Sequence, residues 1–155
     1  KALGSHAVST HHNGSLELLL VDDSDDDILM IREVFTEATR LNLKVVKDGE
    51  EAMAYVRREG KYRDARPPRL VLLDLRMPKK DGFAVLKEIK ADPSLRHLPI
   101  VVLTTSSREE DVVRSYAAGT AAYITKPVGV TEWQQMARQF VAYWTQVVRL
   151  PAAGG

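Results

Sequence analysis

Several side chains that can carry chemistry stand at the ends of apolar runs in this sequence. Four largely apolar runs end in such residues: the first in Asp22 and Asp23, the second in Asp74, the third in Thr104 and the fourth in Lys126. Short continuous apolar runs are typical of strands that are buried on both faces of a parallel sheet. Ligands of such sheets bind at the carboxyl ends of the strands. We therefore expect acids, a hydroxyl and one lysine to meet at one edge of a sheet.

The three carboxylates of Asp22, Asp23 and Asp74 are hard oxygen ligands of the kind that hold Mg²⁺ together with water and phosphate oxygens. Without a cation, each like-charge pair at about 4 Å costs roughly 4 kcal/mol at an effective dielectric near 20. Lys126 can supply a compensating ammonium. A phosphoryl group on one carboxylate would add about −1.5 to −2 charges. The metal ion and the lysine would then both be needed, and the Thr104 hydroxyl could donate to a phosphoryl oxygen.

Each of these features also has a local structural explanation. Aspartates ahead of a helix usually compensate its dipole, and we interpret Asp25, Asp26 and Asp27 in this way only. A threonine after a strand commonly caps the next helix, and a Lys-Pro pair commonly forms a turn. These local roles do not explain why all four features stand at four successive strand ends.

Strands and helices are predicted to alternate five times along the chain. The apolar runs predict strands at about 17–22, 43–47, 70–74, 100–103 and 121–125. Helical spacing predicts helices at about 24–38, 48–59, 82–93, 106–119 and 131–148. Repeated βα units of this length predict an α/β fold of the (βα)5 type, a doubly wound five-stranded parallel sheet with right-handed crossovers.

Residues at the predicted helix ends favour particular caps. The caps are Ser24, Asp48 in a capping box with Glu51, either Ser106 or Ser107, and Thr131 in a capping box with Gln134. Gly119 is expected to end the fourth helix. Leu29 is expected on the buried side of the first helix.

Length and composition favour one globular domain. The chain has 155 residues and is 45% hydrophobic, which is enough for a core. A net charge of +1 favours neither nucleic acid nor a membrane surface as partner. The absence of cysteine fits a reducing compartment, and we expect a cytoplasmic location. We expect residues 1–15 to form a tail, 16–150 the domain with its long last helix, and 151–155 a flexible end.

The strand-end motifs are specific when taken together. They are Leu20-Val21-Asp22-Asp23, Leu73-Asp74-Leu75-Arg76-Met77-Pro78, Val102-Leu103-Thr104-Thr105 and Tyr123-Ile124-Thr125-Lys126-Pro127. In this order they resemble the signatures of the two-component response-regulator receiver domain, which has a CheY-like, flavodoxin-like fold. The resemblance extends over about residues 16–148.

The resemblance implies a role for each matched residue. Asp74 would be the phosphoacceptor. Asp22 and Asp23 would bind Mg²⁺ together with Asp74, and the backbone carbonyl of Arg76 would be a further ligand. Lys126 would contact the phosphoryl group.

Two further features follow from the same resemblance. Thr104 and Tyr123 are similar to the family's switch pair, in which the hydroxyl moves toward the phosphoryl group and the aromatic ring turns inward. The alternative for Tyr123 is a half-buried strand aromatic with no such role. The peptide bond between Lys126 and Pro127 would be cis.

A closer resemblance is to stand-alone regulators that partner bacterial phytochrome histidine kinases. It rests on the aspartate run 22–27, the basic loop 62–67 and the tail 143–151. It implies a sensor histidine kinase as partner, and a homodimer formed through the end of the last helix together with the fifth strand or the fourth helix. The expected dimer residues are Trp144, Val147, Val148 and Leu150. The alternative is that these side chains pack onto the domain's own core.

The predicted function is a single-domain response regulator that accepts a phosphoryl group on Asp74 and catalyses its own phosphoryl transfer and hydrolysis. It would act as a messenger, or as an intermediate or sink in a phosphorelay. The main enzyme alternative is a haloacid-dehalogenase-like phosphatase, but that class needs a second acid where this chain has Arg76. A transcription factor would need residues for a DNA-reading domain, which the expected domain does not leave.

Overall fold

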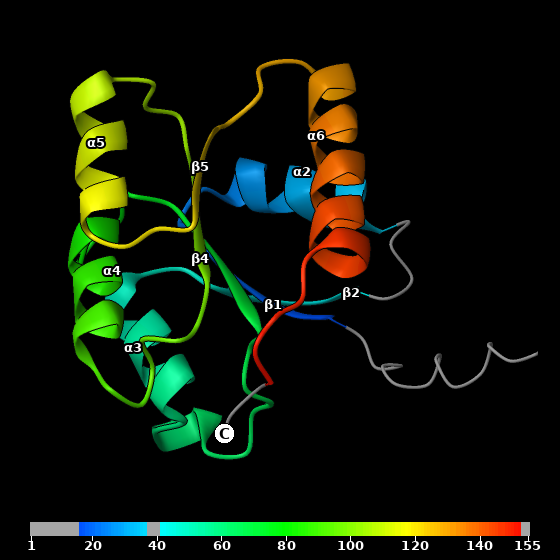
Figure 1. The fold of residues 1–155 in the computed structure, drawn as a ribbon. Helices are drawn as coiled ribbons and strands as arrows, with labels where there is room; N and C mark the ends of the chain where they lie inside the picture. The colour runs from blue at the N-terminus through cyan, green and yellow to red at the C-terminus, as the bar shows by residue number, and fades with distance from the viewer. Residues whose placement is uncertain (1–15, 37–40, 153–155) are drawn as a thin grey trace, which may run out of the picture.

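The computed structural model describes residues 16–36 and 41–152, and these form one parallel sheet with helices on both faces (Figure 1). The five strands are β1 (Leu16–Val21), β2 (Leu41–Val46), β3 (Leu70–Leu73), β4 (Ile100–Thr104) and β5 (Ala122–Thr125). Their spatial order is β2-β1-β3-β4-β5, and every neighbouring pair is parallel. The predicted doubly wound sheet is confirmed.

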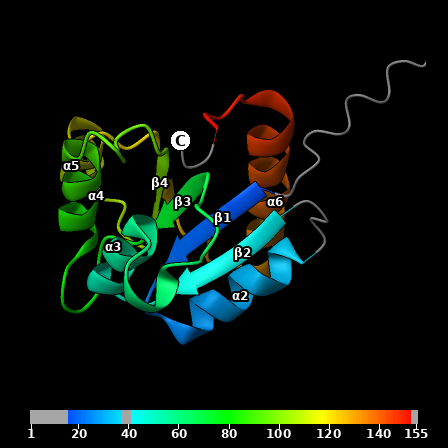
Figure 2. The same cartoon turned by 90° about the horizontal axis from the view of Figure 1, so that it is seen from below.

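Helices lie between and after the strands as the sequence predicted. They are α2 (Asp25–Phe35), α3 (Gly49–Arg57), α4 (Gly82–Ala91), α5 (Glu109–Ala117) and α6 (Val130–Ala142), with a 3-10 turn η3 (Gly60–Tyr62) and a π turn η4 (Tyr143–Val147). Figure 2 shows α2 and α6 on one face of the sheet and α3, α4 and α5 on the other. No helix in the described residues has the length and apolar character to cross a membrane.

The sheet divides the core into two layers because side chains alternate across a strand. On β1, Leu18 and Leu20 belong to the cluster that α2 and α6 cover. Leu19 and Val21 belong to the cluster that α3 and α4 cover. β1, β3 and β4 are therefore buried on both faces, which explains their uninterrupted apolar sequence.

The N-caps predicted for the first two helices, α2 and α3, are present in the structure. Ser24 Oγ accepts a hydrogen bond from the Asp27 backbone N–H at 3.2 Å, and Asp48 accepts one from the Glu51 N–H at 2.7 Å. The expected box at Asp48 is half formed, because the Glu51 carboxylate accepts from the Lys47 N–H instead of from Asp48. Gly119 ends α5 with a left-handed φ of 108°.

Three other expectations about the helices are wrong. α5 follows Arg108 without a side-chain cap, because its cap position lies two residues after Ser106 and one after Ser107, so neither serine stands there. α6 follows Gly129, which places Thr131 inside the first turn and removes the expected box. Leu29 is 63% exposed, because Ile28 and Ile31 form the buried side of α2. The expected tail 1–15 and the predicted helix end at 38 lie outside the described residues.

Candidate functional site

Backbone hydrogen bonds bring the strand-end residues to one edge of the sheet. Asp74 N donates to Val21 O at 2.9 Å and Lys126 N donates to Thr104 O at 2.7 Å. The parallel ladder thus continues for one residue beyond β3 and β5, which fixes the backbone from which Asp74 and Lys126 project. Asp22 is fixed in the same way by its N–H, which donates to the carbonyl of Val46.

Three carboxylates meet at this edge as expected. One oxygen each of Asp22, Asp23 and Asp74 lies within 4.8 Å of the others. Asp22 is fully buried and Asp74 is 7% exposed, whereas Asp23 is open to solvent. The set therefore has one ligand on the solvent side and two beneath it, an arrangement that a hydrated divalent cation can enter.

The hydrogen bonds of Asp22 leave it able to bind a cation. Its Oδ1 accepts from the Ser24 N–H at 2.9 Å. Its Oδ2 is 2.7 Å from Lys126 Nζ, but this contact is an ion pair without good hydrogen-bond alignment, and no other described residue donates to that oxygen. Burial raises the pKa of Asp22 despite the opposing effect of Lys126. These donor atoms fit a hard divalent ion.

Lys126 is the shared cation of the site. Its side chain is almost fully buried, and Nζ lies 2.7 Å from Asp22, 2.7 Å from Asp27 and 3.1 Å from Asp74. Burial alone would lower the pKa of Lys126, but the close contacts with Asp22 and Asp27 and the charge of Asp74 outweigh it and raise the pKa above the usual value. The ammonium therefore offsets much of the repulsion among the acids.

Asp27 is a site residue that the sequence reasoning missed. We interpreted it as compensating the helix dipole only, which is wrong, because its carboxylate also accepts a hydrogen bond from Lys126. Asp27 lies three residues after the Ser24 cap, so its side chain projects from the first turn of α2. That spacing from the cap was the one available signal, and it is shared by most capped helices.

Thr104 and the Asp74 carboxylate are in direct contact. The fully buried Thr104 hydroxyl donates to Asp74 Oδ1 at 2.9 Å, and the Arg76 N–H donates to the same oxygen at 3.3 Å. Lys126 pairs with the other oxygen, Oδ2. Both oxygens of Asp74 are thus held by groups that can also bind a phosphoryl oxygen.

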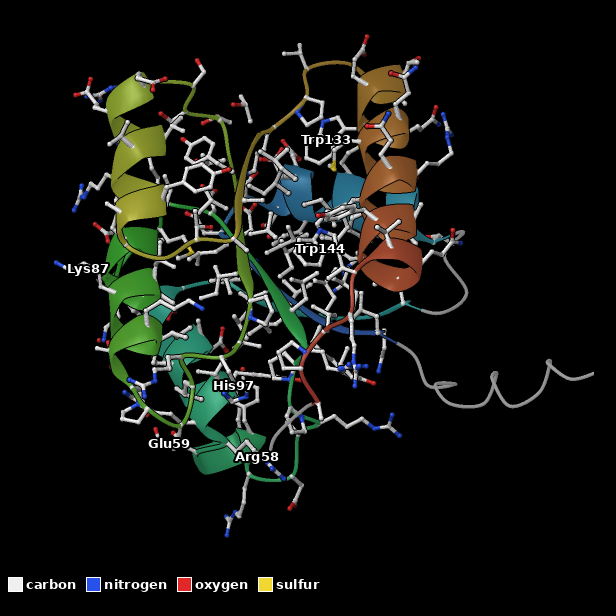
Figure 3. All side chains as sticks on the ribbon, in the orientation of Figure 1. Arg58, Glu59, Lys87, His97, Trp133 and Trp144 are labelled. Carbon is white, nitrogen blue, oxygen red and sulfur yellow. The ribbon has the colours of Figure 1, made fainter. Side chains whose placement is uncertain are left out.

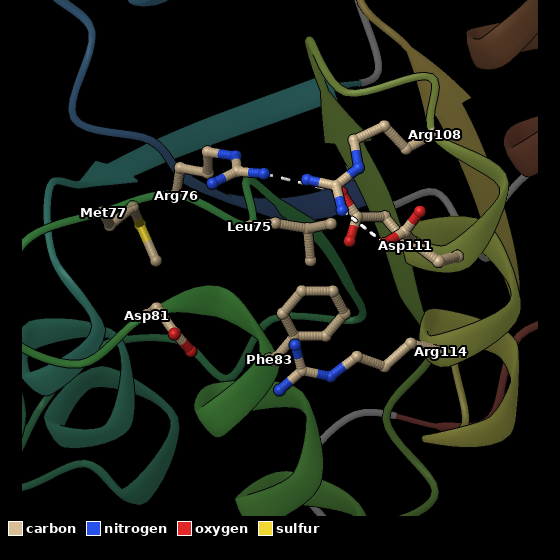
Figure 4. A pocket seen from close by; sticks show the side chains of 9 residues that line it. Leu75, Arg76, Met77, Asp81, Phe83, Arg108, Asp111 and Arg114 are labelled. Atoms are coloured by element: carbon tan, nitrogen blue, oxygen red, sulfur yellow. Dashed lines mark hydrogen bonds and ion pairs between the residues drawn. The ribbon is translucent and has the colours of Figure 1, made fainter.

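The side chain of Arg76 forms its ion pair with Asp111, outside the group of Asp22, Asp23 and Asp74. It lines a pocket of about 610 Å³ between the β3–α4 loop and α5, where its guanidinium forms an ion pair with Asp111 at 3.6 Å (Figure 4). The sequence position where a haloacid-dehalogenase-like phosphatase would need its second acid thus carries a basic side chain that pairs with Asp111.

Tyr123 is a half-buried residue of β5 that packs against Leu75, Phe83 and Val102. Its hydroxyl donates to the backbone carbonyl of Ser106 at 2.8 Å. Burial raises the pKa of the Tyr123 hydroxyl, so it stays protonated and able to donate. The ring therefore contacts the loop that follows Thr104.

The expected cis peptide bond before Pro127 is wrong, because the bond is trans. Trans is the more stable form of an X–Pro bond.

Most of the expected dimer residues contact the chain's own core. Leu150 is buried, and Trp144 and Val148 pack against the same cluster, whereas Val147 is 71% exposed. Figure 3 shows Trp133 and Trp144 projecting from one side of α6 and its extension, toward the sheet. Three of the four side chains therefore follow the alternative prediction, in which they pack onto the core of their own chain.

Known response regulators are similar to this chain in sequence and in fold. The sequence model of the response regulator receiver domain matches residues 18–138. Response regulator Rcp1 of Synechocystis is 40% identical over 94% of this chain and all of its own length. The phosphorylated cyanobacterial phytochrome response regulator RcpA has a similar structure, with a TM-score of 0.86 and 41% identity over 90% of this chain and all of the other. The Mn²⁺-bound form of Rcp1 has a TM-score of 0.81 and 39% identity over 88% and 99%.

Proposed function

The chain belongs to the response regulator receiver domain family, and on this premise we propose that it accepts a phosphoryl group from a histidine kinase onto Asp74. The observation that supports this assignment most is the set of groups that contact the Asp74 carboxylate. Thr104 and the Arg76 N–H contact one oxygen, Lys126 contacts the other, and Asp22 and Asp23 lie beside it.

In the proposed reaction, an oxygen of Asp74 forms a bond to phosphorus while the P–N bond of the kinase phosphohistidine breaks, and the imidazole leaves with that electron pair. Asp22, Asp23, Asp74 and the Arg76 carbonyl would hold Mg²⁺, which screens the negative charge between acceptor and donor. Lys126 holds one phosphoryl oxygen electrostatically, and the Thr104 hydroxyl donates to another. Hydrolysis by water then regenerates the Asp74 carboxylate.

Mass spectrometry of the intact protein tests the assignment. With a small phosphodonor and Mg²⁺, we expect one labile phosphoryl addition, which is absent in Asp74→Asn and in excess chelator. Asp26→Asn is a matched control, since it also removes one acidic group near this edge but lies outside the contacts of Asp74. Undiminished labelling of Asp74→Asn would overturn the assignment, and transfer in chelator would exclude the need for a divalent ion.

We further propose that the kinase partner is a phytochrome-type sensor in the cytoplasm. The support is the similarity to the cyanobacterial phytochrome response regulator RcpA and to RPA3017, a response regulator in red light signaling of R. palustris. A phosphotransfer time course against a panel of purified kinases tests this. Fastest transfer from a kinase without a phytochrome module would contradict it. The same experiment with a histidine phosphotransfer protein added separates a messenger from a relay intermediate or sink.

We also propose that two chains associate through the distal end of α6. Val147 and Tyr143 support this, because they are exposed while their neighbour Trp144 packs inward. Val147→Asp should lower the mass measured by light scattering to that of one chain, and Leu29→Asp, at an exposed site on α2, should not. A wild type that stays monomeric at high concentration, with and without a phosphoryl group, would rule the dimer out.

A further inference from the structure

We propose that Asp111 is a positioning residue for the Thr104 and Tyr123 pair, because its buried carboxylate joins the loop after the phosphoacceptor to the loop after Thr104. This inference rests on the proposed phosphorylation of Asp74. Asp111 is only 7% exposed although it lies in the first turn of α5, where acids are ordinarily solvated.

The partners of Asp111 come from two loops of the site. Its Oδ2 accepts a hydrogen bond from the Ser106 hydroxyl at 2.6 Å and lies 3.6 Å from the guanidinium of Arg76. Ser106 is two residues after Thr104, and Arg76 is two residues after Asp74. One carboxylate therefore connects the segments that carry both the acceptor and its hydroxyl partner. A buried carboxylate is costly without such partners, so the arrangement is strongly favoured once Asp111 is buried.

Ser106 extends the connection to Tyr123. Its carbonyl accepts from the Tyr123 hydroxyl at 2.8 Å, and its own hydroxyl oxygen accepts from the Arg108 N–H at 3.3 Å. Asp111 thus fixes the carbonyl that holds the Tyr123 ring against Leu75 and Phe83. On the far side of Phe83, the Arg114 guanidinium stacks on its ring at 3.7 Å (Figure 4).

The network has a direct consequence for the reaction. Thr104 already donates to Asp74, and Tyr123 already donates to Ser106. Both contacts depend on the backbone conformation of residues 104–108. Asp111 stabilises that conformation through its hydrogen bond from Ser106. Without Asp111 this loop loses its anchor, so the Thr104 hydroxyl is misplaced for a phosphoryl oxygen and the Tyr123 ring loses its fixed acceptor.

The test compares Asp111→Ala with Asp111→Asn, and uses Glu109→Ala as control. The asparagine oxygen can still accept from Ser106, whereas Glu109 is an exposed acid of the same helical turn. Asp111→Ala should lower the maximal rate of phosphorylation by a small donor about tenfold, as expected for a misplaced catalytic group. The half-saturating donor concentration should stay unchanged. Asp111→Asn should recover most of the rate, and Glu109→Ala should match wild type.

A second measurement reports the position of Tyr123 without phosphorylation. Fluorine NMR of 3-fluorotyrosine protein, with the Tyr123 signal assigned by Tyr123→Phe, should show that signal moving toward its solvent-exposed shift in Asp111→Ala. If Asp111→Ala does not fold, Ser106→Ala removes the same hydrogen bond from the other side and should move the signal equally. Wild-type rate and an unmoved Tyr123 signal in a folded variant would overturn the proposal. If wild type is not phosphorylated at Asp74, the proposed function fails, but the fluorine signal still decides the role of Asp111.

Discussion

At the scale of single residues, Lys126 is what allows several acids to share one buried edge. It contacts three carboxylates within 3.1 Å, and two of them belong to the set that fits a divalent ion. Ammonium and metal ion therefore compensate overlapping negative charge. The stability of the protein and its affinity for the metal should be coupled through this lysine.

Lys126→Met is expected to lower the free energy of unfolding by about 3–5 kcal/mol in chelator, because it leaves buried charges unpaired. Millimolar Mg²⁺ should restore a larger share of stability in this variant than in wild type, since the ion then compensates the acids alone. Urea titrations with and without Mg²⁺ measure both effects. Lys44→Met removes an exposed lysine from β2 and should change little. Equal losses in the two variants would show that the buried ion pairs contribute nothing.

Tyr62 provides a prediction about pH. Burial, followed by its 2.8 Å hydrogen bond to Glu51, raises the pKa of Tyr62 from 10.0 to about 12. Because the folded state then binds more protons than the unfolded state between pH 10 and about 12, this contribution to stability is complete below pH 10 and is lost as the pH rises through that window. Tyr62→Phe should remove this part of the pH dependence, whereas Tyr116→Phe, at an exposed tyrosine, should keep it. Urea unfolding across the window decides between these outcomes.

At the scale of elements, the start of α4 is packed directly against the backbone of Asp74 and Leu75. A Cβ on Gly82 would lie 2.1 Å from the Asp74 carbonyl oxygen, and the Gly82 N–H donates to Leu75 O at 2.9 Å. The helix and the end of β3 are therefore in backbone contact. Only glycine allows this contact, and it fixes where the Asp74 side chain begins.

Gly82→Ala is expected to destabilise the fold by about 3 kcal/mol, in the upper range of overpacking, because backbone atoms and not a flexible side chain must move. Phosphorylation should slow as well, since Asp74 shifts with the β3 end. Gly129→Ala is the matched control, because its Cβ would meet only the end of the Glu132 side chain. Denaturant unfolding and phosphorylation rates are the measurements. A Gly82→Ala protein as stable and as reactive as the control would show that the contact relaxes freely.

At the scale of the whole molecule, the chain after α6 returns to the sheet and closes one end of the core. Leu150 is buried in the α2 and α6 layer. The Arg69 guanidinium, which projects from just before β3, donates to the carbonyls of Leu150 and Pro151 at 3.2 to 3.4 Å. We expected residues 16–150 to form the domain, and this contact supports including Leu150 in it.

Leu150→Ala should therefore lower the free energy of unfolding by about 2 kcal/mol, through lost burial and the cavity that remains. Val147→Ala should stay within about 0.5 kcal/mol, as is usual for exposed positions. Thermal and urea unfolding at low protein concentration measure these effects without a contribution from association. A larger loss in Val147→Ala that grows with protein concentration would instead favour the dimer interface as the source of stability.

The sequence alone determined the sheet and the meeting of Asp22, Asp74, Thr104 and Lys126. Apolar runs identify buried strands, and parallel strands must bring their carboxyl ends to one edge, so a polar residue after each run is placed by topology. The same reasoning gave Ser24 and Asp48 as caps, because a cap contacts a backbone group only three residues away.

The partners of Asp27, Asp111 and Leu150 could not be predicted from the sequence and are set by how distant segments pack together. Asp27 and Lys126 are 99 residues apart, and Asp111 binds Ser106 from the loop before its helix but pairs with Arg76 from the loop after β3. The spacing of apolar residues reports which face of an element is buried, and it carries no information about which distant polar group lies opposite. In the sequence, an acid in the first turn of a helix that only compensates the helix dipole cannot be distinguished from one that pairs with a distant residue. The close packing of α2 and α5 against the strand ends places Asp27 beside Lys126 and Asp111 beside Arg76.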